Sequence, residues 1–249
     1  MQVSIITPTY NSERYILETY QCLKEQTHTD WEWLVTDDCS TDSTLTLLKD
    51  LSKKDSRISV FSNRKNSGAA IARNNSIALS QGEFIAFLDS DDLWKYDKLE
   101  KQLSFMGRDY DFSFSGYELI DHMSKKLNKT VDTSQNGAFS YSDMLMKKAT
   151  LGCSTVMLRK SFVKDKRMPL LRTGQDYAYW LLLLRDGAKA RVIPEPLTFY
   201  RITPNSISRN KIKKARRQWE IYRDVEGIGI YRSLYFFLYY AFRAVFRKI

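Results

Sequence analysis

The sequence has few of the residues that form covalent cross-links or imidazole metal sites. Its three cysteines (Cys22, Cys39 and Cys153) lie far apart and show no CxxC spacing. This argues against a disulfide framework or a zinc site and favours reduced thiols in a cytosolic protein. The two histidines, His28 and His122, are also far apart, so we expect no histidine-based metal site.

Long apolar runs are missing as well. No positively charged leader with an apolar stretch and a cleavage site opens the chain, so we expect no secretion signal. Near the other end, the uncharged interval between Arg232 and Arg243 holds ten residues, or about 15 Å as a helix. That is half of the hydrocarbon core of a bilayer, so we expect no membrane span.

The composition is otherwise that of a globular protein, with 43% hydrophobic and 27% charged residues in a chain of 249. This length suits one large α/β domain with a small appendage. The net charge of +10 is concentrated at one end, because residues 201–249 contain 12 Lys and Arg against three Asp and Glu. Residues 1–200 are nearly neutral, so the basic character belongs to the tail.

Apolar stretches alternate with amphipathic ones along the first hundred residues. We predict a strand over 3–7 that Pro8 ends, and further strands over 31–36, 58–62 and 84–88, separated by helices. Residues 122–138 are polar and predicted to form a loop. Strands that alternate with helices at this spacing indicate an α/β fold with a mainly parallel central sheet and helices on both faces.

Acidic residues follow two of these strands and open a later helix. Asp37 and Asp38 come after the second strand, and Asp89, Asp91 and Asp92 after the fourth. Gly174-Gln175-Asp176 begins a strongly apolar helix. Because ligands bind beyond the carboxyl ends of parallel strands, we expect these acids to share one cleft, where Mg²⁺ or Mn²⁺ can offset their repulsion. The simpler alternative is that they only form turns and helix caps.

Four segments carry a resemblance to a known family. SIITPTYN (4–11), DDCSTD (37–42), NSGAAIARN (66–74) and DSDD (89–92) are similar in order and spacing to motifs of family 2 glycosyltransferases. The resemblance covers roughly residues 2–205 and implies an inverting enzyme with the GT-A fold that uses a nucleotide-activated sugar. It implies a glycosyltransferase domain over 1–205, with a nucleotide-sugar-binding half (1–107) and an acceptor half (108–205), followed by a tail (206–249).

The resemblance also implies roles for single residues. Asp38 matches the carboxylate that accepts the N3–H of uracil, and Asp91 matches the direct ligand of Mn²⁺ or Mg²⁺ in the DxD element. The residues expected at the donor nucleotide are Pro8, Thr9, Tyr10, Asp38, Gly68, Arg73, Asp89, Ser90 and Asp91, with Asp89 as a second metal ligand. Arg73 is alternatively a solvated helix residue.

Asp176 matches the general base of the family, which takes the proton from the acceptor hydroxyl. Gln175 stands where the family usually has Glu. Alternatively, Asp176 is only an acid favoured by the helix dipole. Gln175, Arg201 and Trp94 are further candidates for contacts with the diphosphate or the acceptor, although Trp94 is more typical of a residue that packs the loop.

The tail reads as a charged helix from Lys211 followed by an aromatic-rich helix over 228–246. On a helical wheel one face carries arginines and the opposite face is apolar, which fits a helix lying in the plane of a membrane surface. Packing on the catalytic domain or a partner is the alternative. The arginines are Arg232, Arg243 and Arg247, and the apolar residues are Leu234, Phe237, Leu238, Ala241 and Val245.

Together these features predict transfer from a UDP-sugar to a lipid-linked saccharide, with a polyprenyl-diphosphate as the lipid. The product would be a β-glycoside in a cell-surface polysaccharide of the O-antigen or capsule type. We expect a cytoplasmic protein, peripheral on the inner face of the cytoplasmic membrane, that binds no nucleic acid. The alternatives are a sugar-nucleotide pyrophosphorylase, which should carry a Gly-rich loop in place of Pro8–Asn11, a donor-binding homologue without activity, or a basic nucleic-acid-binding protein.

Overall fold

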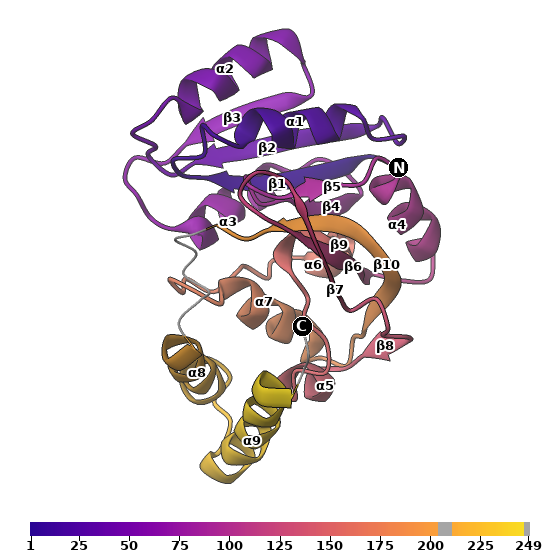
Figure 1. Cartoon of the computed structure of the whole chain (residues 1–249), viewed down its shortest axis with the longest axis vertical. Coiled ribbons are helices and arrows are strands. Elements are labelled where there is room, and N and C mark those ends of the chain that lie inside the picture. Colours follow the sequence, from indigo (N-terminus) through magenta and orange to yellow (C-terminus); the bar gives the residue numbers. More distant parts are fainter. Residues whose placement is uncertain (204–210, 247–249) are drawn as a thin grey trace.

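A computed structural model describes residues 1–203 and 211–246, and one ten-stranded sheet runs through these residues (Figure 1). The strands are β1 (Val3–Thr9), β2 (Trp31–Asp37), β3 (Ile58–Ser62), β4 (Phe84–Phe87), β5 (Leu93–Trp94), β6 (Phe112–Ile120), β7 (Lys126–Val131), β8 (Ala138–Phe139), β9 (Val156–Arg159) and β10 (Ala190–Arg201). The helices are α1 (Ile16–Lys24), α2 (Thr44–Lys54), α3 (Ala69–Leu79), α4 (Lys98–Met106), α5 (Tyr141–Leu145), η1 (Cys153–Thr155), α6 (Lys160–Val163), α7 (Gln175–Leu184), α8 (Lys211–Glu220), η3 (Ile221–Val225) and α9 (Ile230–Phe246).

The sheet changes character at its middle. Strands β3, β2, β1 and β4 lie side by side and are all parallel, as the alternation of strands and helices predicts. Next to β4, strand β9 runs antiparallel, and β6 and β10 beyond it are parallel to each other. The half that carries the predicted nucleotide motifs is therefore the purely parallel half.

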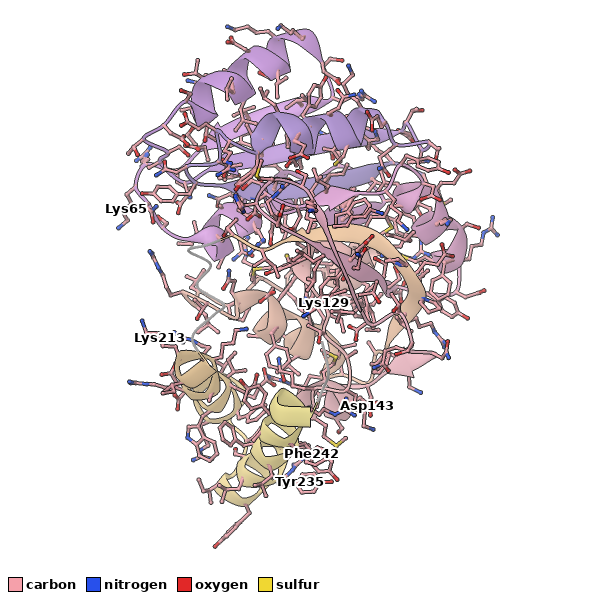
Figure 2. All side chains as sticks on the ribbon, in the orientation of Figure 1. Lys65, Lys129, Asp143, Lys213, Tyr235 and Phe242 are labelled. Atoms are coloured by element: carbon pink, nitrogen blue, oxygen red, sulfur yellow. The ribbon has the colours of Figure 1, made fainter. Side chains whose placement is uncertain are left out.

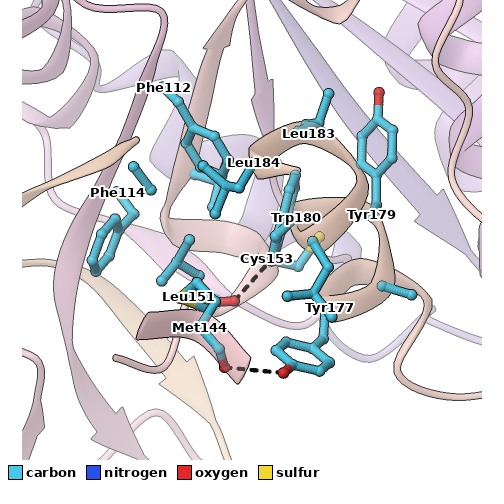
Figure 3. Packing of buried hydrophobic residues seen from close by; sticks show 14 of the residues in the cluster. Phe112, Phe114, Met144, Leu151, Cys153, Tyr177, Tyr179, Trp180, Leu183 and Leu184 are labelled. Carbon is cyan, nitrogen blue, oxygen red and sulfur yellow. Dashed lines mark hydrogen bonds between the residues drawn. The ribbon is translucent and has the colours of Figure 1, made fainter. Parts of the chain in front are cut away.

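Helices cover both faces of the sheet, as predicted (Figure 1). Strand β4 shows why, because Ile85 and Phe87 point into one apolar core and Phe84 and Ala86 into the other. Helices α1, α2 and α4 close the second core, while α3, α5 and α7 close the first. Trp180 of α7 lies at the centre of the first core and donates its ring N–H to the carbonyl of Leu151 (Figure 3).

The predicted end of the first strand at Pro8 is wrong, because β1 continues to Thr9. The carbonyl of Ile6 accepts a hydrogen bond from the N–H of Leu88, which marks the β4 side of the strand. Backbone groups alternate between the two sides, so the nitrogen of Pro8 also faces β4. The pairing with β4 ends at Ile6, so the missing N–H costs no ladder hydrogen bond there.

The predicted loop over 122–138 is also partly wrong, because it contains strand β7 and begins β8. Five of the six residues of β7 are exposed, and the strand pairs only with β6. An exposed edge strand needs no apolar alternation and commonly carries lysines. The apolar pattern in the sequence therefore gives no sign of it.

The C-terminal helices pack against the end of the molecule that carries α7 (Figure 1). Ile221, Tyr222 and Phe236 join the core beneath α7, and Arg243 donates to the carbonyls of Lys147 and Lys148. No helix among the described residues is long and apolar enough to cross a membrane.

The predicted faces of the aromatic helix need correction. Arg243 and Phe237, expected on the two free faces, both contact the protein, since the ring of Phe237 lies 5.6 Å from that of Trp219. The outward face is aromatic and apolar, as the projecting Tyr235 and Phe242 show (Figure 2). Arg247 and the side chain of Val245 lie outside the described residues.

Candidate active site

The carboxyl ends of β1, β2 and β4 meet at one edge of the sheet and carry three of the predicted motifs. A pocket of about 440 Å³ opens there, and Ser90 and Asp91 of the DxD element form part of its wall. Ser12 joins the first and last motif, since its hydroxyl lies 2.8 Å from that of Ser90. The residues that line this pocket are Tyr10, Asn11, Ser12, Arg14, Tyr15, Ser90, Asp91 and Thr203.

Asp38, predicted to bind uracil, organises the loop ahead of α3. One carboxylate oxygen accepts hydrogen bonds from Ser67 N (2.8 Å) and Asn63 Nδ2 (2.7 Å). The other accepts one from Gly68 N (2.7 Å), which leaves it capacity for a further donor. Gly68 has φ of +89°, and a Cβ there would meet no atom within 4 Å. This glycine is thus required by its backbone conformation and leaves open space beside Asp38.

Pro8 and Thr9 are buried, whereas Tyr10 is exposed. Both buried residues lie in β1, and Thr9 donates its hydroxyl to Asp37. Tyr10 is 51% exposed and stands at the pocket. Of these three predicted nucleotide residues, Tyr10 alone presents its side chain to the pocket.

Arg73 forms the ionic centre of the site. It is buried, and its guanidinium pairs closely with the carboxylate of Asp89. Burial on its own would lower the pKa of Arg73, but the charge of Asp89 raises it above its ordinary value. The charge of Asp176 also raises the pKa of Arg73, and the charges of both acids add to burial in raising the pKa of the Cys153 thiol. The structure therefore brings the last strand-end acids and the helix-start acid, 87 positions apart in sequence, to the same pair of residues.

The other two acids of the DSDD motif differ in their surroundings. Asp92 is fully buried and accepts hydrogen bonds from Ser154 Oγ (2.6 Å) and Arg201 N (2.9 Å). Burial and the charges of Asp91 and Asp89 raise its pKa well above the ordinary value. Asp91 is half-buried at the pocket, where burial and then the charge of Asp89 raise its pKa to about 6. Asp91 is thus the acid of the motif that lines the pocket.

Asp176 lies in the first turn of α7, as its spacing from Gly174 predicts. Gly174 precedes the helix in the left-handed conformation (φ +69°), which turns the chain into α7. Gln175 next to it has a buried Oε1 with no hydrogen-bond partner among residues 1–203 and 211–246. Asp176 itself is half-buried, so a solvent-borne hydroxyl has access to its carboxylate.

Arg201 and Trp94 turn away from the pocket. Arg201 donates to Asp91 O (2.6 Å), Ser124 Oγ (2.7 Å) and Glu18 (2.8 Å), so each side-chain nitrogen has a protein partner. Trp94 is 3% exposed and donates its ring N–H to Ser154 O. In this arrangement both side chains hold the DxD turn in place, in contrast to the predicted contacts with diphosphate or acceptor.

Ser154 was not identified from the sequence, although it is central to the site. Its hydroxyl donates to Asp92 and accepts from the N–H of Asp89, so it fixes both ends of the DxD turn. Ser154 is more than 60 positions from both acids, and nothing in its sequence neighbourhood marks it. Glu18, which also holds Arg201, lies in an ordinary amphipathic helix and carries no signal either.

A second hollow, about 660 Å³, lies between α4 and β10. Its lining includes Tyr96, Lys101 and Glu195, and it contains none of the predicted site residues. Three of the predicted site residues, Tyr10, Ser90 and Asp91, line the smaller pocket at the strand ends instead.

Comparison with known proteins gives consistent relatives along the whole chain. Residues 4–165 match the family model for glycosyl transferase family 2. The chain is 43% identical over 248 residues to the putative teichuronic acid biosynthesis glycosyltransferase TuaG of Bacillus subtilis (strain 168), covering 99% of this chain and 97% of TuaG. It is 37% identical over 239 residues to WfgD of Escherichia coli, covering 95% and 91% of the two chains. WfgD is named a UDP-Glc:alpha-D-GlcNAc-diphosphoundecaprenol beta-1,3-glucosyltransferase.

Solved structures agree on the fold. The chain superposes on residues 1–349 of Staphylococcus aureus TarS, crystallised with UDP-GlcNAc, with a TM-score of 0.71 and 23% identity. The match covers 90% of this chain and 67% of the TarS chain. With a GT-A sheet, the four motifs at its edge and relatives along its full length, this chain belongs to glycosyl transferase family 2.

Proposed function

We propose that this glycosyltransferase moves a sugar from a UDP-sugar to a hydroxyl of a saccharide linked to a polyprenyl diphosphate, with inversion at the anomeric carbon. Two relatives support the substrate classes. WfgD is named for a UDP-glucose donor and a diphosphoundecaprenol acceptor, and TuaG for teichuronic acid biosynthesis. The product then belongs to a cell-surface polysaccharide.

The observation that carries the proposal is that the buried Arg73 pairs with Asp89 and that the charge of Asp176 also acts on it. One acid belongs to the predicted donor motif and the other to the predicted general base. A donor held at Asp89–Asp91 therefore presents its sugar towards Asp176. Both acids have side chains that are at least partly exposed, so substrates have access to them.

We assign the proton transfer to Asp176. Its carboxylate takes the proton of the acceptor hydroxyl while the hydroxyl oxygen forms a bond to the anomeric carbon. The bond between that carbon and the phosphate oxygen breaks on the opposite face, and its electron pair leaves with UDP. An α-linked donor gives a β-glycoside. The hydroxyl must come within about 3 Å of the carboxylate, directly or through one water.

The residues at the DxD turn fit a divalent cation. Asp89 is paired with Arg73 and Asp92 is bonded internally, so Asp91 remains as a half-buried carboxylate without an ion pair in the described chain. Burial and then repulsion by Asp89 raise the pKa of Asp91, and a bound cation would offset both by favouring the charged carboxylate. We propose that Asp91, with Asp89, holds Mn²⁺ or Mg²⁺, which when bound neutralises charge on the departing diphosphate.

The roles of the donor residues follow from these positions. We propose that Tyr10 and Asp38 bind the base and ribose, since the space beside Gly68 is open and one oxygen of Asp38 can accept a further hydrogen bond. Ser90 lines the pocket next to them. Arg73 acts through Asp89, because its charge is already paired there.

We also propose that the protein works in the cytoplasm on the inner face of the membrane, bound through the tail. Apart from the exposed Arg232, the exposed side chains of α9 between residues 230 and 243 are apolar or aromatic and follow the helical repeat. Such rings fit the boundary between headgroups and acyl chains, and arginine fits anionic lipid. The outward residues are Tyr231, Leu234, Tyr235, Leu238, Tyr239 and Phe242.

The experiment is a transfer assay with the purified protein, Mn²⁺ and a synthetic GlcNAc-diphosphate-lipid acceptor. UDP-glucose, UDP-galactose and their N-acetyl counterparts are tested in turn. We expect product from at least one donor, with a β linkage by NMR. Asp176→Asn should lower kcat by roughly 10²–10⁴-fold and leave the Kd for UDP unchanged.

Asp165→Asn, at an exposed acid in the loop before α7, is the matched control and should keep full activity. UDP binding without transfer from any donor would identify a donor-binding homologue and contradict the proposal. Full activity of Asp176→Asn would contradict the assignment of the base.

A further inference from the structure

The C-terminal helices contact the segment that leads into Asp176. A Cβ placed on Gly174 would lie 3.1 Å from Ile221 Cδ1 and 3.5 Å from Arg217 Cγ. Arg217 Nε also donates to Thr173 Oγ1 at 3.1 Å. The basic tail therefore forms one wall beside the amino end of α7 and is part of the surroundings of the predicted general base.

Three cationic side chains belong to this wall and the adjoining loop. Arg172 is exposed and has no ion pair or hydrogen bond within the described residues. Arg217 shares its charge with Glu220 at 2.8 Å. Lys214 is exposed and lies one turn before Arg217 on the same side of α8.

The positive charge here exceeds its local compensation. Glu220 is bonded to both Arg216 and Arg217, so it neutralises neither fully. The amino end of α7 adds partial positive charge from its free N–H groups. Cations from the loop before α7 and from α8, with this partial charge beside them, favour a polyanion.

The proposed acceptor carries a polyanion, its diphosphate, close to the sugar that must reach Asp176. If a hydroxyl of its sugar reaches Asp176, the diphosphate attached to the same sugar lies one ring away. Arg172 is four positions before Asp176, and Arg217 is hydrogen-bonded to Thr173, three positions before it. The lipid can then continue past α8 towards α9, because the two helices pack together through the rings of Trp219 and Phe237.

Resting on the function proposed above, we propose that Arg172, Lys214 and Arg217 form a subsite for the diphosphate of the lipid-linked acceptor. The subsite is separate from the donor diphosphate, which belongs to the DxD turn across the cleft. It gives the basic tail a role in substrate binding in addition to contact with the membrane.

The test compares two acceptors that differ only in the diphosphate. One is a GlcNAc-diphosphate-lipid, and the other is a GlcNAc glycoside of the same lipid without phosphate. Arg172→Gln should raise the KM for the first by roughly tenfold, which corresponds to about 1.4 kcal/mol, and leave the KM for the second and for the UDP-sugar unchanged. Arg172→Lys should retain most of the affinity, and Lys214→Gln should act in the same direction as Arg172→Gln.

Arg108→Gln is the control, since Arg108 is exposed beyond the far end of α4. Equal effects of Arg172→Gln on both acceptors, an effect on the KM for the donor, or no effect would overturn the subsite. Binding of the diphosphate acceptor is measured in parallel by calorimetry. Weaker binding by Arg172→Gln supports the subsite even if no transfer occurs, so loss of the proposed function and loss of the subsite give different results.

Discussion

Arg73 shows at the level of one residue how the site tolerates several acids. Its position four residues after Ala69 places it one turn into α3, on the side that faces the DxD turn. There it pairs with Asp89 and also contacts the sulfur of Met168. Removing one member of a buried ion pair leaves an uncompensated charge and costs more than the pair contributes.

Arg73→Met should lower the free energy of unfolding by about 2 kcal/mol, less than for a fully buried pair, because the side chain of Asp89 is 28% exposed. Arg73→Met/Asp89→Asn should recover part of this loss, since the unpaired charge is then absent. Urea unfolding at pH 7.5 measures the free energy of unfolding of both variants. Equal stability of the single and double variants would show that the pair is not the source of the effect.

Lys98 is a second buried cation, with a different origin. It lies fully buried behind Trp94, with Nζ 4.2 Å from the ring centroid and 2.5 Å from Gln102 Oε1. Burial lowers its pKa from 10.5 to about 7. Between these values the unfolded chain binds more protons than the folded chain, so this residue makes the protein more stable as the pH rises.

We expect the stability of the wild type relative to Lys98→Met to increase between pH 7 and pH 9. The increase should approach 1.4 kcal/mol per pH unit, about the limit for one proton. Urea unfolding at pH 7, 8 and 9 provides the measurement, and the comparison with Lys98→Met removes the contribution of other groups. A difference in stability that does not vary with pH would contradict the lowered pKa.

At the level of elements, helix α7 depends on the C-terminal segment for its start. The left-handed Gly174 and the side chain of Ile221 fit each other closely, and Tyr222 lies under the same helix with its hydroxyl on Leu145 O at 2.5 Å. Ile221 and Tyr222 both belong to the π-helical turn η3. The segment between residues 221 and 225 therefore sets where Asp176 stands.

Gly174→Ala should destabilise the protein by about 1–2 kcal/mol, because alanine disfavours positive φ and its Cβ would crowd Ile221. We expect kcat to fall together with stability, since Asp176 is displaced. Gly174→Ala/Ile221→Val relieves only the crowding. If the double variant recovers fully, the backbone conformation contributes little; if it recovers nothing, the crowding does not matter. Thermal unfolding and the transfer assay distinguish these outcomes.

At the scale of the whole molecule, the charge and the exposed rings lie at the end away from β3. Helix α9 is fixed by Phe236 and Arg243 on its inner side and leaves an apolar stripe on its outer side (Figure 2). Leu238 in the middle of that stripe is 69% exposed. An exposed apolar stripe beside basic residues marks an interaction surface.

Leu238→Asp should reduce binding to anionic vesicles several-fold, because it places a negative charge at the proposed contact. It should leave transfer to a water-soluble acceptor unchanged. Met123→Asp, at a loop methionine that is 73% exposed, should bind vesicles like the wild type. Vesicle sedimentation with phosphatidylglycerol-containing and neutral lipids measures both. Equal binding by all three proteins would contradict a membrane role for α9.

Much of the fold follows from local patterns. The apolar stretch before Asp89 and the alternation around it predict a buried parallel strand, because burial on both faces requires continuous apolar residues. The acids at strand ends follow from the same pattern. Strand β7 escapes prediction since its residues are exposed and its stability comes from hydrogen bonds to β6. The continuation of β1 through Pro8 was not predicted, because the rule that proline ends a strand takes no account of where the neighbouring strand β4 stops.

The sequence by itself determined the family, the sheet edge that carries the site and the presence of acids there, since each depends on residues close together in the chain. Only the tertiary structure decided the partners of those residues. Arg201 turns inward to Glu18, 183 positions away, and Ser154 holds the DxD turn from a distant segment. The inner face of α9 was likewise decided by contacts with Lys147 and Lys148, because a helical wheel specifies which residues share a side but not what lies against it.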